Sequence, residues 1–273
     1  MKKLIATLAI AGAMGTAGLF AQTGESIEDL SISATLDYES SYIFRGIKFN
    51  EDSFQPGAEF GFPVLGGDLY AGAWANLPIT GVGSNANELD FYGGFAYPVT
   101  DIITVDAGFT YYWFPNGVSL DRQQGATEPD NALAAYVEPY VGASFDVLLS
   151  PAIYIFYSLD QGGGSSYDIL TIEASIGYSF DLAEYVGLEG LSLDLGAYAG
   201  VLIPDDSVEA GLQSAFYGGI TADLVYSFNE NVSSSVGFRY SNFSLDGGPA
   251  GGADPYANSQ NNIWVGATLG FAY

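Results

Sequence analysis

The stretch NIWVGATLGFAY, residues 262–273, decides the fold of this chain. Every second residue in it is apolar, and these residues share one face: Ile263, Val265, Ala267, Leu269, Phe271 and Tyr273. A period of two is the period of a β-strand. A soluble edge strand with so long an apolar face would invite aggregation. If this strand belongs to a membrane barrel instead, the same alternation should recur along the rest of the chain.

The same alternation recurs in eleven further stretches, which we predict to be strands. They are residues 30–38, 54–62, 68–77, 88–97, 102–114, 133–145, 151–159, 167–180, 191–201, 216–228 and 232–243. Pro139 lies inside one of them and removes a ladder hydrogen bond. The connections alternate between mostly short and mostly long. An even strand number with this alternation is typical of outer-membrane barrels.

Aromatic residues mark one end of the predicted strands. The six strands that run toward the short connections end in an aromatic on the apolar face: Phe62, Tyr97, Phe145, Phe180, Phe228 and Tyr273. Tyr42, Phe44 and Trp113 suit the opposite rim. A soluble β-sandwich gives no reason for such a girdle. We therefore expect an all-β fold, a transmembrane antiparallel up-and-down β-barrel of about 12 strands. The final strand resembles the sorting signal of bacterial outer-membrane barrels, which implies recognition of the Tyr273 strand by the barrel-assembly machinery.

The first 21 residues have the features of a signal peptide. Lys2 and Lys3 precede an uncharged stretch, and Ala21 is a plausible last residue before cleavage. We expect residues 22–273 to form a single barrel domain in the bacterial outer membrane. No cysteine is present, so neither a lipid anchor nor a disulfide is expected.

Composition excludes several classes of function. After the leader, four basic residues face 32 acidic ones, so nucleic acid is not an expected partner. The chain has no histidine, the general base on which outer-membrane phospholipases and proteases rely. Without histidine and cysteine a zinc site lacks its usual ligands, and no P-loop motif occurs. We predict no catalytic residues, no metal, no cofactor and no enzymatic activity.

Ten acidic residues and two arginines fall on the polar face of the predicted strands, which in a barrel points into the lumen. They are Asp37, Glu39, Arg45, Glu59, Glu88, Asp90, Asp106, Glu138, Glu173, Asp194, Asp223 and Arg239. Rings of carboxylates favour cations in a water-filled pore; alternatively, these acids only hydrate the lumen. The arginines either form a constriction opposite carboxylates or make charge pairs that hold the wall together. Arg45 also suits the outer rim, beside lipid phosphates.

The first third of the mature chain resembles a known protein family. LDYESSYIFRGIKFNED (36–52), DLYAGAWAN (68–76), ELDFYGGFAYPV (88–99) and AGFTYYWFP (107–115) resemble the TorF-like putative porins, which carry a Tyr-x-Phe-Arg-Gly element. AAYVEPYVGASF (134–145) looks like the next strand of that family. The resemblance implies an outer-membrane barrel and a channel. It implies no substrate and no catalytic residue.

The expected function is passive diffusion of small hydrophilic solutes or ions through the barrel, with a preference for cations. The alternative is a non-conducting structural or surface-binding barrel with acidic extracellular loops. Many polar-face positions are Gly, Ser, Ala or Thr, which leave room for water, whereas Tyr92, Tyr112, Tyr140 and Tyr198 narrow the lumen. The expected partners are outer-membrane lipid and small solutes or cations. Nothing in the sequence indicates an oligomeric state.

Overall fold

The computed structural model describes residues 30–80, 87–118, 133–159, 168–205, 214–245 and 260–273. These ranges form twelve strands, as predicted, and one short helix between β8 and β9, α1 (Ala183–Val186). No helix in these ranges is long and apolar enough to cross a membrane. The strands are β1 (Ser31–Phe44), β2 (Ile47–Val64), β3 (Gly67–Pro78), β4 (Glu88–Thr100), β5 (Ile103–Val118), β6 (Leu133–Phe145), β7 (Ala152–Ser158), β8 (Ile169–Asp181), β9 (Leu191–Pro204), β10 (Ala215–Ser227), β11 (Val232–Leu245) and β12 (Gln260–Ala272).

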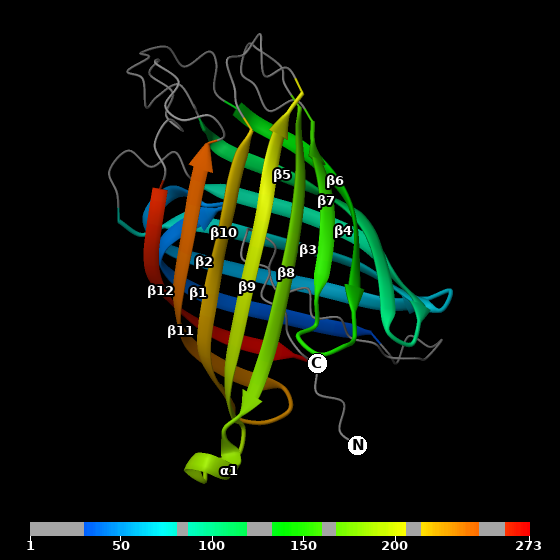
Figure 1. The fold of residues 1–273 in the computed structure, drawn as a ribbon, viewed down its shortest axis with the longest axis vertical. Coiled ribbons are helices and arrows are strands. Elements are labelled where there is room, and N and C mark those ends of the chain that lie inside the picture. Colours follow the sequence, from blue (N-terminus) through cyan, green and yellow to red (C-terminus); the bar gives the residue numbers. More distant parts are fainter. Residues whose placement is uncertain (1–29, 81–86, 119–132, 160–167, 206–213, 246–259) are drawn as a thin grey trace.

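The strands close into one barrel, which confirms the predicted fold class. Each strand pairs antiparallel with its neighbours in sequence, and β12 closes the barrel onto β1. This closing ladder extends from the pair Ser33↔Ala272 to the pair Glu39↔Gly266. In Figure 1, β8 to β11 run steeply across the front while β1 to β5 cross behind them. Such a crossing is what strand tilt in a closed barrel produces.

The short connections gather at one end of the barrel. Two residues join β2 to β3 and β4 to β5, and four join β10 to β11. The connection between β8 and β9 carries α1, which projects at the bottom of Figure 1. At the opposite end, β1 and β2 meet in a two-residue turn, Arg45 and Gly46. The five long connections predicted at that end lie largely outside the described residues.

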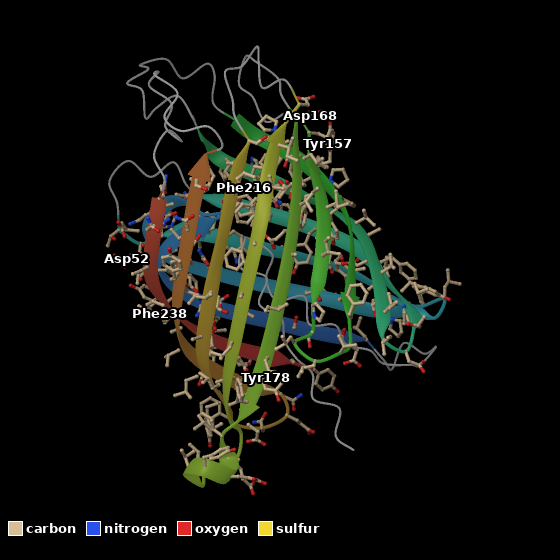
Figure 2. The ribbon with its side chains drawn as sticks, in the orientation of Figure 1. Asp52, Tyr157, Asp168, Tyr178, Phe216 and Phe238 are labelled. Carbon is tan, nitrogen blue, oxygen red and sulfur yellow. The ribbon has the colours of Figure 1, made fainter. Side chains whose placement is uncertain are left out.

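The outer wall is apolar along its height. Phe60, Phe109 and Ile263 each expose more than half of their surface, and Tyr178, Phe216 and Phe238 lie at different heights on this wall in Figure 2. Of the six girdle aromatics, all but Phe145 are exposed, and Phe145 is half-buried. A soluble protein rarely exposes so much contiguous apolar surface. Lipid is the solvent that suits this wall.

Two prolines interrupt the ladders within the wall. Opposite β3, the pairing of β2 skips Gln55 and Pro56 and resumes at Gly57. Between β6 and β7 the ladder ends at Tyr140, directly after Pro139, and returns only as the isolated bridge Val137↔Leu159. Proline has no N–H to donate, so both gaps follow from the sequence. The barrel accepts Pro139 inside a strand because its other neighbour, Phe109 on β5, still pairs with it.

The first two strands are longer than their alternation predicts. β1 continues to Phe44 and β2 begins at Ile47, whereas the predicted strands end at residue 38 and begin at residue 54. The prediction that Tyr42 and Phe44 belong to an outer aromatic girdle is wrong, because Tyr42 is buried and both rings pack inside the barrel. Trp113, by contrast, is exposed on the outer wall.

Candidate functional site

The hairpin formed by residues 40–52, which we call the plug hairpin, leaves the wall of the barrel. From Thr35 to Glu39, the residues of β1 alternate between half-buried and exposed. Ser41, Tyr42 and Ile43 are then all buried, so both faces of the strand are covered. The ladder between β1 and β12 also ends at Glu39, while β1 and β2 stay paired with each other as far as Phe44↔Ile47. A strand covered on both faces and unpaired on its β12 side has turned into the lumen.

The turn of the plug hairpin lies against the inner wall of β10 and β11. Arg45 and Gly46 both have positive φ, +48° and +82°, as a two-residue hairpin turn requires. A Cβ on Gly46 would lie 2.9 Å from Phe243 Cβ and 3.0 Å from Tyr217 Cβ. Both the conformation and the close approach therefore require glycine at this position. On β12, Asn262 donates to the carbonyl of Gly46 at 3.1 Å.

Arg45 crosses the lumen to the opposite wall. Its two guanidinium nitrogens donate to the two carboxylate oxygens of Glu138 on β6, at 2.8 and 2.7 Å. Its guanidinium also lies 4.9 Å from the ring centroid of Phe156 on β7. β7 is the strand opposite β1 in the closed barrel. Arg45 is 7% exposed and Glu138 is fully buried, so this is a buried, bidentate ion pair.

Glu138 has further donors around it. Tyr112 on β5 donates to Glu138 at 3.2 Å, and Ser158 on β7 also donates to its carboxylate. A buried carboxylate is stable only when its charge is paired and its lone pairs are satisfied. The wall therefore presents a preformed acceptor for the arginine at the hairpin turn.

Apolar contacts hold the plug hairpin on either side of Arg45. The ring of Phe44 lies 6.0 Å from that of Tyr112 on β5, and that of Tyr42 lies 5.6 Å from that of Trp74 on β3. Ile47 packs on the other side against a buried cluster from β9, β10 and β11. Together with Arg45, these contacts reach most of the inner circumference. The hairpin therefore crosses the lumen at this level.

The base of the plug hairpin is fixed by hydrogen bonds to β3. Asn50 donates to Ser53 at 2.7 Å, and Asn76 on β3 donates back to Asn50 at 2.9 Å. Asp52 accepts hydrogen bonds from Tyr38 and Thr80 at 2.7 and 2.6 Å, and it lies near the barrel surface in Figure 2. The hairpin thus has a polar anchor at its base, where it joins the wall.

Two acids lie under the plug hairpin on β4. Glu88 and Asp90 point to the same side of the strand, and they are 4% and 0% exposed. Tyr42 of the hairpin donates to Glu88 at 2.8 Å. We call Glu88 and Asp90 the acid pair.

The second arginine joins neighbouring strands. Arg239 on β11 lies 2.7 Å from Asp223 on β10 and 3.6 Å from Glu39 on β1. A Cβ on Gly237 would come within 2.1 Å of Asp223 Oδ1 and 2.3 Å of Arg239 Nη1, so this glycine makes room for the ion pair. Arg239 therefore connects β10 and β11 to β1 on one side of the lumen.

Tyrosine rings cover many of the glycines that line the lumen. In the described ranges, a Cβ added to any of six inward glycines would touch a tyrosine from a neighbouring strand. The pairs are Gly72–Tyr92, Gly94–Tyr70, Gly108–Tyr140, Gly142–Tyr154, Gly200–Tyr217 and Gly219–Tyr198. The prediction that such glycines leave room for water is wrong at these positions. Tyr92, Tyr112, Tyr140 and Tyr198 are all buried inside the barrel.

The structure brings most of the predicted lumenal residues together in two groups, and none of the twelve is exposed. Arg45, Glu138, Glu88, Asp90 and Glu173 lie around the plug hairpin, the last receiving a hydrogen bond from Tyr217 at 2.6 Å. Arg239, Asp223, Glu39 and Asp37 lie along β1, β10 and β11. Asp194 lies opposite Asp223 in the ladder of β9 and β10, and it accepts a hydrogen bond from Ser192 at 3.0 Å. Outside both groups, Asp106 accepts from Tyr70 at 2.8 Å and Glu59 contacts Tyr92.

The plug hairpin itself was not predicted from the sequence. A signal was present, because Tyr42-Ile43-Phe44 is an uninterrupted apolar run that breaks the alternation of Leu30 to Tyr38. An apolar run without alternation indicates a segment covered on both faces.

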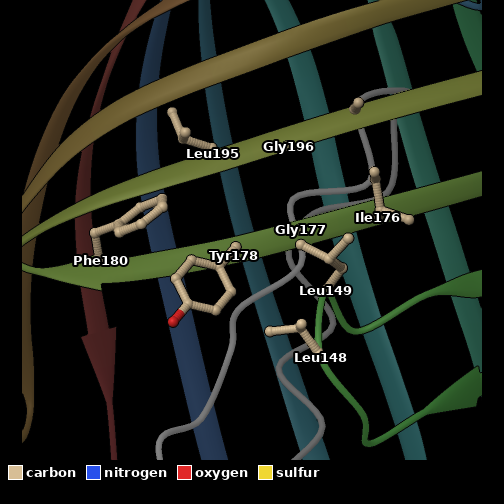
Figure 3. Close-up of a pocket in the computed structure, with 9 residues that line it drawn as sticks. Leu148, Leu149, Ile176, Gly177, Tyr178, Phe180, Leu195 and Gly196 are labelled. Carbon is tan, nitrogen blue, oxygen red and sulfur yellow. The ribbon is translucent and has the colours of Figure 1, made fainter.

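An apolar groove of about 400 Å³ lies on the outer wall near the short connections. Leu148 and Leu149 of the β6–β7 connection lie over Ile176, Tyr178 and Phe180 of β8 (Figure 3). It contains no charged residue. Among the described residues, no group of three or more acids is arranged to hold a metal ion.

Residues 22–186 match the model of a family described as bacterial protein of unknown function (Gcw_chp). The chain belongs to this family. The matched residues include β1 to β8, and therefore both the plug hairpin and Glu138. The match does not carry the TorF-like porin name that the sequence motifs suggested. No curated protein matches this Gcw_chp chain significantly.

Several solved structures have folds similar to this one. The NanC porin has a TM-score of 0.49 and 13% identity, over 87% of this chain and 98% of its own. LpxR from Salmonella typhimurium has a TM-score of 0.43 and 11% identity, over 88% and 99%. OmpT of Vibrio cholerae has 0.42 and 8%, over 90% and 98%. Similarities this distant say nothing about what the Gcw_chp chain transports or binds.

Proposed function

We propose that this protein is a porin-like channel of the bacterial outer membrane, which passes small hydrophilic solutes or ions when the plug hairpin leaves the lumen. The observation that carries the proposal is the ion pair between Arg45 and Glu138, which joins a hairpin to the wall opposite it. Side chains alone can fill the core of a barrel. They do not require the ends of β1 and β2 to separate from the neighbouring strands and turn inward. The proposal also includes cleavage of the signal peptide after Ala21 and assembly into the membrane through the Tyr273 strand.

The same proposal includes a preference for cations. Ten acids and two arginines line the lumen, and both arginines are already paired with acids. The unpaired excess is negative, so an open lumen would attract cations and repel anions. No catalytic role is assigned to any of these residues, because the chain contains no histidine or cysteine.

The test compares the wild-type chain with a chain in which the plug hairpin is removed. Glu39 pairs with Ser53, so Ser40 and Asp52 come next in register. Replacing residues 41–51 with Asn-Gly leaves a two-residue turn that suits these flanking strands. Both refolded proteins are examined in planar bilayers under a salt gradient, after circular dichroism has established their β-structure.

We expect brief, rare current steps from the wild type and sustained steps from the shortened chain, with a reversal potential that reports cation preference. Anion preference would contradict the role given to the acids. A folded, shortened barrel without current would contradict the channel. That result would favour a non-conducting structural or surface-binding barrel, which a hairpin across the lumen also suits.

A further inference from the structure

The acid pair under the plug hairpin has an unusual arrangement. Glu88 and Asp90 lie two residues apart on one face of β4, and both side chains are buried. No amide, hydroxyl or guanidinium group of the described residues donates to either oxygen of Asp90. Two ionised carboxylates only accept hydrogen bonds, so two buried neighbours with no donor to Asp90 favour a proton on one of them.

The surroundings of the acid pair offer no other positive charge to replace that proton. Within the described residues, no cation is among the groups that act on Glu88 or Asp90, and both terminal nitrogens of Arg45 already donate to Glu138. Glu138 on β6 also faces Asp90 and adds a further negative charge. The remaining titratable groups around the pair are tyrosines: Tyr42 from β1, Tyr112 from β5, Tyr136 from β6 and Tyr92 from β4 itself. Like charges this close in a buried place do not both ionise.

We propose that Glu88 and Asp90 form a proton-binding site that controls the docking of the plug hairpin. The proposal deepens the proposed function, since it concerns the same hairpin. With one proton shared, the pair carries a single negative charge and accepts the hydrogen bond of Tyr42. Loss of that proton leaves two negative charges in a site closed by the hairpin. Departure of the hairpin admits water, which solvates both charges.

The docked hairpin favours the protonated acid pair, because two ionised carboxylates would otherwise be enclosed under it. Raising the pH therefore undocks the hairpin. The test therefore follows the hairpin as the pH rises.

The position of the plug hairpin can be measured by chemical labelling of a single cysteine, with no need for a channel-current measurement. The chain has no native cysteine. Ser41 is buried in the hairpin, and cysteine is close to serine in size. The labelling rate of the Ser41→Cys protein by a membrane-impermeant maleimide is measured from about pH 6 to about pH 9 and is divided by the rate of an unfolded control, since thiolate formation itself speeds the reaction.

We expect the corrected labelling rate of the Ser41→Cys protein to rise by tenfold or more across this range. Adding Asp90→Asn should abolish the rise, because the amide donates to Glu88 at every pH and replaces the shared proton. Adding Asp37→Asn is the matched control and should keep the rise. Asp37 is also two residues from a glutamate on one face of a strand, but it accepts a hydrogen bond from Thr35 and lies outside the plug hairpin.

A corrected rate that does not change with pH, or a rise that persists in Asp90→Asn, would overturn the proton site. This readout follows the hairpin alone. A protein that labels as expected but carries no current would retain the proton site and contradict the channel.

Discussion

The two arginines inside the barrel show how the same chemistry serves two different purposes. Arg45 pairs with an acid 93 residues away on the opposite wall. Arg239 pairs with Asp223 on the neighbouring strand, and their strands are already joined by a continuous ladder. Breaking the first pair releases a hairpin that has no ladder to β12, whereas breaking the second leaves the ladder in place. The location of an ion pair, more than its type, decides whether it holds a movable segment or a wall.

The largest effect should come from Arg45→Ala. Removing one partner of a buried ion pair typically costs about 3–5 kcal/mol, because the other charge stays buried and unpaired. The hairpin can escape that cost by undocking, so the ratio of undocked to docked protein should rise by roughly 10²–10⁴-fold. Single-channel open probability measures this ratio. An open probability equal to that of the wild type would show that Arg45 does not hold the hairpin.

Arg239→Met should lower stability without opening the channel. Asp223 and Glu39 would lose their partner, at a cost of about 1–3 kcal/mol in the free energy of unfolding. Urea unfolding in lipid vesicles measures this cost, and open probability should remain that of the wild type. If Arg239→Met opened the channel as Arg45→Ala does, the distinction between the two arginines would be lost.

Gly237→Ala tests the ion pair between Arg239 and Asp223 without removing either charge. The added methyl group would overlap Asp223 and Arg239, and we expect a loss of about 1–3 kcal/mol in stability from overpacking. Gly57→Ala is the matched control, since its nearest neighbour would be Thr35 Oγ1 at 3.2 Å. Equal unfolding midpoints for the two variants would mean that Gly237 does not serve the ion pair.

The smallest effect concerns ion selectivity. Asp194 is half-buried in the lumen and bound only to Ser179 and Ser192 among the described residues. In the chain without the plug hairpin, Asp194→Asn should move the reversal potential slightly toward the non-selective value. Asp101→Asn, in an exposed turn between β4 and β5, should leave it unchanged. A larger shift from Asp101→Asn would place the selective charges at the rim of the barrel.

Periodicity predicted the wall well and the lumen poorly, for a physical reason. Along β4, Leu89 and Phe91 must face lipid and Glu88 and Asp90 must face inward, so the alternation is enforced at every step. The plug hairpin meets protein on both faces, so no alternation is enforced there and strand assignment stopped at residue 38. The pairing of Arg45 with Glu138 depends on the closure of the whole barrel, which local patterns do not contain.

The surroundings of the lumenal glycines also depend on strand pairing that local sequence does not contain. Gly108 looks like open space in the sequence, and only the register between β5 and β6 brings Tyr140 over it. Composition alone therefore indicated a wider lumen than the structure has.

The most direct test of the account is to fasten the plug hairpin to the wall with a disulfide. In the Arg45→Ala chain, Gly46→Cys and Phe243→Cys place the two Cβ atoms 2.9 Å apart before relaxation, within an ångström of the ~3.5–4.5 Å of a disulfide. No native cysteine competes for the bond. The single variant Gly46→Cys, in the same Arg45→Ala chain, controls for strain at the positive φ.

The measurement is single-channel current before and after a reducing agent is added to the same bilayer. The account predicts silence in the oxidised protein and sustained steps after reduction, with no redox effect in the single-cysteine control. Oxidised protein that conducts as fully as reduced protein would contradict the claim that residues 40–52 close this barrel.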